Sequence, residues 1–257
     1  MKEFFMSKEG SEIYPEDLHH GISELFAKPK YSHERTHRNM LTLPNGYSIY
    51  DAIKKYQALG FNKVTVKPTR QEWLERPGIE ERADGHLYFN DFPIALATQH
   101  GSKLYGMDNA GSDDDWYLVL DDSMSSRRAL SKQRKSGDDD RMLISMQQFI
   151  ELIAEGSHQA LEAKFSPFAY KAPVPYEAMI NKTIPSNVGV GHKYRSAAKS
   201  FMASGIEENS EKKIKHSVRL SADYGDYLAQ DKIQPLKTPN QRRIIEQIAS
   251  EIIKAYK

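Results

Sequence analysis

Short apolar runs, each bounded by turn-forming or charged residues, recur through the middle of the chain. The runs that predict strands are Leu87–Phe89, Phe92–Thr98, Trp116–Leu120 and Met142–Met146. After the last run the apolar residues change to helical spacing, which predicts helices over Gln147–Ala154 and Ser157–Phe165. Strands and helices in one continuous stretch favour an α/β (α+β) core over residues 86–170, with a small mixed sheet.

The stretches on either side of this core differ from it in pattern. Residues 171–257 are expected to form a C-terminal helical bundle, with predicted helices at Gly191–Ala203, Lys212–Ala229 and Pro239–Tyr256. Residues 1–85 are interpreted as an N-terminal α/β appendage of unknown role. Its predicted elements are helices at Tyr50–Leu59 and Arg70–Arg76 and a strand at Lys63–Val66.

The charge balance limits how this chain can attract other molecules. With 36 Lys+Arg against 35 Asp+Glu, the net charge is +1, so binding of a polyanion requires local clusters of basic residues. No apolar run is long enough for a membrane-spanning helix, and the first residues lack the apolar core of a signal peptide. The sequence has no cysteine, which excludes disulfides and thiolate metal sites. We therefore expect a soluble, cytoplasmic protein with no membrane partner.

A glycine-serine turn and a pair of aspartates stand close together in the core. The predicted strand ending near Thr98 runs into Gly101-Ser102, where a glycine lets the backbone approach a phosphate and a hydroxyl can help to hold it. The second element is Asp113-Asp114-Asp115, directly before the strand Trp116–Leu120. Alternation along a strand places Asp113 and Asp115 on one face and Asp114 on the other.

Two carboxylates on one face of a strand repel each other unless a cation lies between them. Magnesium prefers oxygen ligands of this kind, so the pair predicts a site for Mg²⁺ or Mn²⁺. A glycine-serine turn facing a carboxylate pair is the arrangement that phosphoryl or nucleotidyl transfer by two metal ions requires.

These motifs resemble the DNA polymerase β-type nucleotidyltransferases, whose signature is an apolar strand, Gly-[Gly/Ser], a spacer with a further glycine, and Asp-x-Asp. The matching residues here are Gly101, Ser102, Gly106, Asp113 and Asp115. More narrowly, Gly-Ser-x-Leu-Tyr-Gly with Ser-Asp-x-Asp is similar to predicted nucleotidyltransferases of bacteria and phages, including the RlaP-like group associated with RNA repair. The resemblance extends over about residues 87–236.

Two further segments are similar to this group and imply more site residues. Asp140 lies before a predicted strand where the family has its third carboxylate, which implies a base or third metal ligand. The following Gly-Ser-His-Gln-Ala-Leu-Glu is similar to the family's helix Gly-Asn-Pro-Asn-x-Leu-Glu. Lys213, His216 and Arg219 match the family's Lys-x-x-His-x-x-Arg-Leu helix, which implies contacts with the triphosphate or the acceptor. Ser112, directly before the aspartates, is a further candidate for phosphate binding.

The chain also departs from the family pattern at three places. Asp114 occupies a position between the two aspartates that is usually apolar in the family. Ser157-His158-Gln159 replaces Asn-Pro-Asn at the helix start. The segment from Ser123 to Gly137 contains five basic residues and no acid, which predicts a mobile basic loop.

The resemblance implies a nucleotidyltransferase that uses two Mg²⁺ (or Mn²⁺) ions to transfer NMP from an NTP to a hydroxyl acceptor, with release of pyrophosphate. The acceptor, nucleic acid or another molecule, is left open. A metal-dependent phosphohydrolase acting on nucleotides or nucleic-acid ends would use the same carboxylates, with water as the acceptor. A third hypothesis, from another class, is a non-catalytic module that binds nucleic acid or a protein partner.

Overall fold

In the computed structural model of the 257-residue chain, the structure describes residues 5–6, 12–13, 70–108, 112–121, 123, 132–136, 139–173 and 175–256. These residues divide into two compact units, and the boundary between the units falls between Val190 and Gly191, within one helix. The sheet unit contains the described residues from 70 to 190. The helical unit contains residues 191–256 and a short antiparallel pair, β1 (Phe5–Met6) and β2 (Glu12–Ile13).

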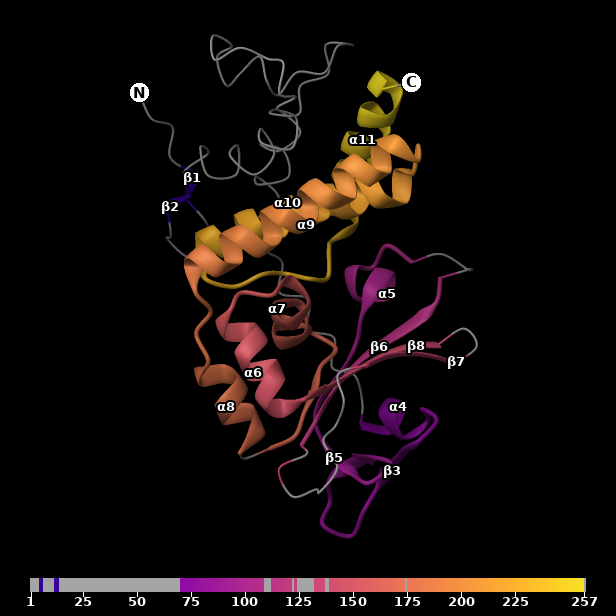
Figure 1. Ribbon diagram of the computed structural model, residues 1–257, viewed down its shortest axis with the longest axis vertical. Helices are drawn as coiled ribbons and strands as arrows, with labels where there is room; N and C mark the ends of the chain where they lie inside the picture. Colours follow the sequence, from indigo (N-terminus) through magenta and orange to yellow (C-terminus); the bar gives the residue numbers. More distant parts are fainter. Residues whose placement is uncertain are drawn as a thin grey trace. The chain divides into compact units, whose positions relative to one another are not determined.

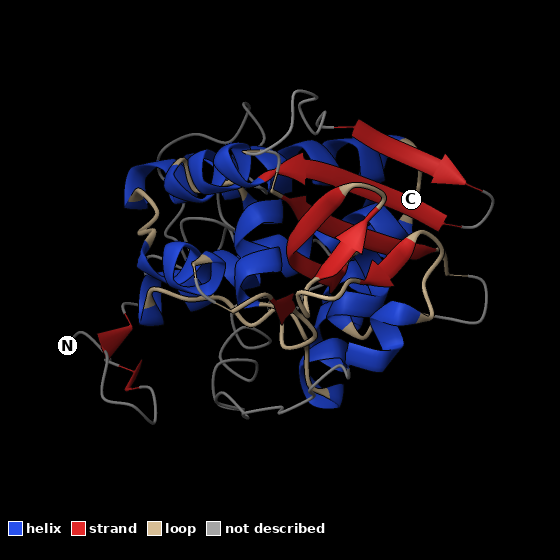
Figure 2. Ribbon diagram, turned by 90° about the horizontal axis from the view of Figure 1, so that it is seen from below, coloured by secondary structure: helices blue, strands red, loops and turns tan. Residues whose placement is uncertain are grey.

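The sheet unit is built around one twisted, mixed sheet (Figure 2). Its strands are β3 (Ile79–Glu81), β4 (Leu87–Phe89), β5 (Phe92–Gln99), β6 (Asp114–Leu120), β7 (Lys132–Ser136), β8 (Asp139–Ser145) and β9 (Tyr170–Lys171). Six strands follow the order β3-β4-β5-β6-β8-β7, and β9 pairs with β5. Neighbouring strands are antiparallel except β6 and β8, which are parallel.

Alternation along β6 separates two apolar layers. Trp116, Leu118 and Leu120 belong to a buried cluster with Trp73, which lies on the short helix α4 (Arg70–Leu74). Tyr117 points to the other face, where its ring lies 5.9 Å from that of Phe149 on α6 (Met146–Ala154). The residues of β6 therefore contact α4 on one face of the sheet and α6 on the other.

Three more of the described helices lie wholly within the sheet unit. They are α5 (Gly101–Tyr105), α7 (His158–Phe165) and α8 (Tyr176–Lys182), and α7 follows α6 after a turn at Gly156. Gly156 has φ +77, and a Cβ there would lie 2.3 Å from the backbone nitrogen of Val190, so only glycine fits this turn. Ser145 caps α6, because its side chain accepts a hydrogen bond from the backbone N–H of Gln148.

The C-terminal region consists of three long helices, α9 (Asn187–Glu207), α10 (Glu211–Gln230) and α11 (Pro239–Tyr256). Figure 1 shows α9 and α10 side by side, and the Ser217 hydroxyl of α10 donates a hydrogen bond to the Ala198 carbonyl of α9 at 2.6 Å. The apolar stripe of α11 is buried, with Ile245 at 1% and Ile252 at 0% exposure. Among the helices that the structure describes, none is long and apolar enough to cross a membrane.

The predicted mixed α/β architecture, with a mixed sheet followed by a helical C-terminal region, is confirmed. The prediction of a loop throughout residues 123–137 is wrong, because β7 forms within it and pairs with β8 as the last strand in the order. The predicted helix Tyr50–Leu59, the predicted strand Lys63–Val66 and most of the N-terminal appendage lie outside the described residues.

Candidate functional site

The chain turns sharply where β5 ends, at the predicted glycine-serine turn. The backbone N–H of His100 donates to the carbonyl of Asp115 at 2.8 Å, which ties the turn to the start of β6. Gly101 then begins the five-residue helix α5 with φ +63, and Gly106 ends α5 with φ 65. The turn is therefore followed directly by a short helix, and Ser102 lies in its first turn.

Gly101 and Asp115 are in close contact. A Cβ built on Gly101 would lie 2.0 Å from Oδ2 of Asp115, which is less than any stable contact between non-bonded atoms. The positive φ of Gly101 is a second reason for glycine at this position. The structure therefore brings the Asp115 carboxylate directly against the glycine-serine turn, although the two are 14 residues apart in sequence.

The three aspartates before Trp116 differ in position. Asp115 lies against Gly101, whereas Asp114 forms ion pairs with Arg76 and with Lys103. The prediction that Asp114 and Asp115 lie on opposite faces of the strand agrees with these contacts. Asp113 is exposed and precedes the first residue of β6, so the strand itself contains only the second and third aspartates.

Asp140 lies beside Asp115 in the sheet. The two residues are Cα partners in the parallel pair of β6 and β8, and their neighbours Asp114 and Asp139 are partners as well. The side chain of Asp140 lies outside the described part of the structure. Where side chains are described, no group of three or more His, Asp or Glu residues is arranged to hold a metal ion. The described candidates for metal binding are thus Asp113 and Asp115.

The two serines assigned to phosphate binding lie in this unit as well. Ser102 is half-buried, and its carbonyl accepts a hydrogen bond from the backbone N–H of Met107 at 2.9 Å, which closes the turn after α5. Ser112 is half-buried and directly precedes Asp113. Ser102 therefore directly follows Gly101, and Ser112 directly precedes the three aspartates.

A buried hydrogen bond connects α5 to α7 on the face of the sheet where Tyr117 lies. The Tyr105 hydroxyl donates to Oε2 of Glu162 at 2.6 Å, and Glu162 is fully buried. Burial, followed by the nearby Glu162 carboxylate, raises the pKa of Tyr117 above its ordinary value. Glu162 ends the Gly-Ser-His-Gln-Ala-Leu-Glu motif, but the sequence contained no signal that Tyr105 would be its partner, since 57 residues separate them.

The predicted basic residues Lys213, His216 and Arg219 lie on α10, in the helical unit, and their surroundings differ. Lys213 is partly exposed, donates to the Ser204 hydroxyl at 2.7 Å and forms an ion pair with Glu208. A hydrogen bond from Nζ of Lys213 to Oε1 of Glu208 holds the pKa of Glu208 below its ordinary value. The His216 ring lies 4.3 Å from the Phe201 ring in an edge arrangement.

Arg219, the third of these residues, is fully buried. Its Nη1 donates to Oδ2 of Asp223 at 2.6 Å, and its Nη2 lies 3.3 Å from Nε2 of His216. Burial of an arginine requires such a partner, because an unpaired buried charge is strongly destabilising. Arg219 is thus held inside the helical unit by a carboxylate one helical turn away.

A second buried cation, Lys237, completes this network. Its role was not predicted from the sequence. Lys237 donates to Oδ1 of Asp223 at 2.5 Å and to Oδ2 of Asp226 at 3.3 Å. Burial raises the pKa of Asp226 to about 7, although Lys237 acts in the opposite direction. The spacing of Arg219, Asp223 and Asp226 along α10 is the sequence signal that could have indicated a shared buried face.

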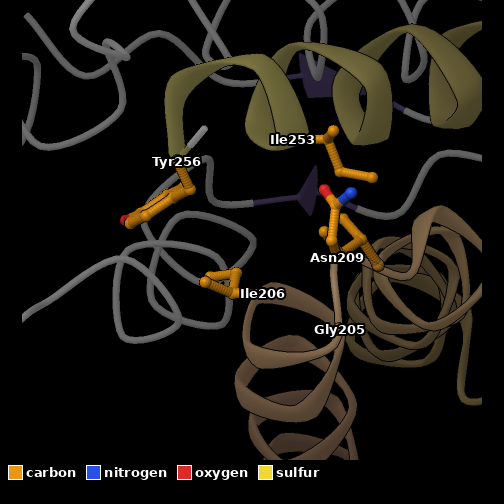
Figure 3. Close-up of a pocket in the computed structure, with 6 residues that line it drawn as sticks. Gly205, Ile206, Asn209, Ile253 and Tyr256 are labelled. Carbon is orange, nitrogen blue, oxygen red and sulfur yellow. The ribbon is translucent and has the colours of Figure 1, made fainter.

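A cavity of about 130 Å³ lies in the helical unit, where the end of α9 meets α10 and α11. Figure 3 shows Ile253 and Tyr256 of α11 across from Ile206 and Asn209. The described residues that line this cavity are uncharged, which is not the lining expected of a phosphate site.

Comparison of the chain with known proteins yields no matching protein-family model, curated protein or solved structure.

Proposed function

We propose that the chain is a Mg²⁺-dependent nucleotidyltransferase, which transfers NMP from an NTP to a hydroxyl acceptor with release of pyrophosphate. The observation that carries this proposal is the contact of the Asp115 carboxylate with Gly101 at the start of α5. This contact joins the two motifs in which the chain resembles the DNA polymerase β-type nucleotidyltransferases.

The donor set fits magnesium. Asp113 and Asp115 offer only oxygen atoms, which Mg²⁺ prefers, and Asp140 is next to Asp115 in register. We assign the metal ions, two Mg²⁺ or Mn²⁺, to these three aspartates. When held by these carboxylates, Mg²⁺ would neutralise the negative charge that develops on the nucleotide phosphates.

The residues of the chain then have distinct roles in our proposal. Backbone N–H groups at Gly101 and Ser102, with the Ser102 hydroxyl and Ser112, bind phosphate oxygens. Asp140 accepts the proton of the acceptor hydroxyl. The acceptor oxygen forms a bond to the α-phosphorus as the bond to the β-phosphate oxygen breaks, and pyrophosphate leaves.

The residues of α10 have a secondary place in this proposal. Lys213 and His216 are candidates for contact with the triphosphate or the acceptor. Arg219, which is buried, would act through its contact with His216 and so position that ring.

The test measures both products of the reaction. The full chain is incubated with Mg²⁺, each [α-³²P]NTP in turn, and total RNA, denatured DNA or the chain itself as the acceptor. We expect labelled acceptor and pyrophosphate in equal amounts, and a loss of at least about 100-fold in Asp115→Asn. Asp91→Asn is the matched control, because Asp91 is 88% exposed and lies outside the site. Label transfer that survives unchanged in Asp115→Asn would refute the assignment.

A further inference from the structure

Asp114 is the middle residue of the three aspartates, and its side chain is mostly buried. It is the first residue of β6 and is 18% exposed. A carboxylate with so little access to water needs cationic partners to remain charged at low energetic cost. Its surroundings therefore show what keeps this charge at the start of the strand.

Two cations from different segments of the sheet unit form ion pairs with the two oxygens of this carboxylate. Arg76, which lies two residues after the end of α4, forms an ion pair with Oδ2 of Asp114. Lys103, on α5, lies with Nζ 3.1 Å from Oδ1. Both partners are partly buried, at 25% and 30% exposure, so water screens these ion pairs less than fully exposed ones.

Arg76 is itself held in place. Its guanidinium lies over the Trp116 ring at 4.7 Å, and its backbone N–H donates to the Trp73 carbonyl at 3.0 Å. The rings of Trp73 and Trp116 meet edge to face at 6.2 Å. Asp114 is therefore anchored to a rigid part of the core.

Lys103 connects the same carboxylate to the proposed phosphate site. It lies two residues after Gly101, within the five-residue helix α5. Asp115 contacts Gly101 on one face of the strand, and Asp114 pairs with Lys103 beside it. The two successive aspartates of β6 thus make separate contacts with α5.

We propose that Asp114 is a positioning residue, which by its ion pairs with Arg76 and Lys103 holds the start of β6 and the turn at Gly101 in the arrangement that binds metal and nucleotide. This inference rests on the proposed function of the same site. It assigns a role to an aspartate that departs from the apolar residue expected there.

The alternative role for Asp114 is a simple contribution of negative charge near the metal site. The two roles predict opposite changes in metal affinity for Lys103→Met. If only charge matters, removal of a nearby cation strengthens the binding of a divalent metal ion. If Asp114 positions the site through Lys103, the same substitution weakens metal binding because the turn is no longer held.

The experiment uses the full chain with the variants Asp114→Asn, Lys103→Met and Arg76→Met, and Lys182→Met as an exposed lysine control on α8. Two readouts are measured without nucleotide: Mn²⁺ affinity by electron paramagnetic resonance, and exchange of the His100 amide by NMR. The His100 amide reports directly on the turn, since it donates to the Asp115 carbonyl. The Asp121 amide donates a hydrogen bond to the Pro93 carbonyl at the far end of β6, so its exchange reports on whether the sheet is folded.

We expect Mn²⁺ affinity to fall about tenfold and His100 exchange to rise about fivefold in both Asp114→Asn and Lys103→Met, with Asp121 exchange unchanged. The double variant Asp114→Asn/Lys103→Met should exceed Asp114→Asn by little, because Asp114→Asn alone already removes the ion pair with Lys103. If Asp114→Asn fails to fold, faster Asp121 exchange shows it. Lys103→Met and Arg76→Met then decide between the two roles of Asp114.

Unchanged His100 exchange, or tighter Mn²⁺ binding in Lys103→Met, would overturn the positioning role. A wild-type chain that binds no Mn²⁺ would instead overturn the proposed function. In that case His100 exchange still decides whether Asp114 holds the turn against β6.

Discussion

The residue at position 101, in the turn after β5, determines whether the Asp115 carboxylate can lie against this turn. Gly101 combines a positive φ with a lack of space for any Cβ, because the Asp115 carboxylate occupies that position. Gly85 also has a positive φ, at +79, but nothing lies within 4 Å of the place where its Cβ would be. A substitution at Gly85 therefore introduces backbone strain alone, whereas a substitution at Gly101 introduces backbone strain and also displaces the carboxylate.

Gly101→Ala should lower both stability and activity. We expect a loss of at least about 2 kcal/mol in unfolding free energy, from backbone strain and displacement of Asp115. Nucleotidyl transfer should fall about 100-fold, since a shift of about 1 Å at a catalytic group has this effect. Chemical denaturation and the label-transfer assay measure the two quantities.

Gly85→Ala is the control for this substitution. It should cost about 1 kcal/mol from its backbone conformation and leave the transfer rate unchanged. Equal effects of the two substitutions on the transfer rate would contradict a specific contact between Gly101 and Asp115.

At the scale of elements, α10 contains two kinds of charged residue. Arg219 and Asp223 are fully buried and paired with each other, whereas Lys213 and its partner Glu208 are 34% and 54% exposed. A buried charge that loses its partner is costly, but an exposed ion pair contributes little.

Arg219→Met and Lys213→Met should therefore differ in their effect on unfolding. We expect the first to lower the unfolding free energy by about 3 kcal/mol, because the buried carboxylate of Asp223 loses its ion pair with Arg219. The second should change it by less than about 1 kcal/mol. Urea denaturation of both variants measures the difference, and similar small losses would mean that Arg219 is not part of a buried network.

The buried carboxyl of Asp226 predicts a pH dependence of stability. Burial raises its pKa from 3.8 to about 7 in the folded chain, so between these values the folded state holds a proton that the unfolded state has released. The contribution of Asp226 to the unfolding free energy is therefore greatest below pH 3.8 and is lost as the pH rises to about 7.

Asp226→Asn removes this titration. The difference in unfolding free energy between wild type and variant should fall by up to about 1.4 kcal/mol per pH unit as the pH rises through this window. Denaturation curves at several pH values between 5 and 8 test this. Parallel pH profiles for the two proteins would show that Asp226 has an ordinary pKa.

Elements with a strong apolar pattern were predictable from the sequence, and elements without one were not. The predicted bounds of Leu87–Phe89 and Pro239–Tyr256 are those of β4 and α11. In contrast, β7 has no apolar residue in Lys132–Ser136, and its pairing with β8 rather than its composition makes it a strand. Such pairing depends on residues that local sequence does not specify.

The candidate site shows the same limit. Alternation along a strand predicted that Asp114 and Asp115 face opposite ways, which agrees with the contacts of the two side chains. The partners of these side chains were not predictable, because Arg76 and Gly101 reach them only through the packing of separate elements. The pairing of Tyr105 with Glu162 was missed for the same reason.

At the scale of the molecule, the proposed chemistry belongs to the sheet unit. Gly101, Ser102, Asp113 and Asp115 all lie within residues 70–190, and Asp140 is in the same sheet. The helical unit contains the motif with Lys213, His216 and Arg219, and its buried charges contribute to its own packing. We therefore propose that one end of β6, with the turn at Gly101, binds metal and nucleotide together.

Anomalous diffraction from crystals of the full chain soaked with Mn²⁺ and α,β-methylene-ATP tests this claim most directly. We predict manganese bound to the carboxylates of Asp113 and Asp115, with the triphosphate against the backbone of Gly101 and Ser102. Manganese and nucleotide bound elsewhere, with Asp113 and Asp115 free of metal, would contradict the account.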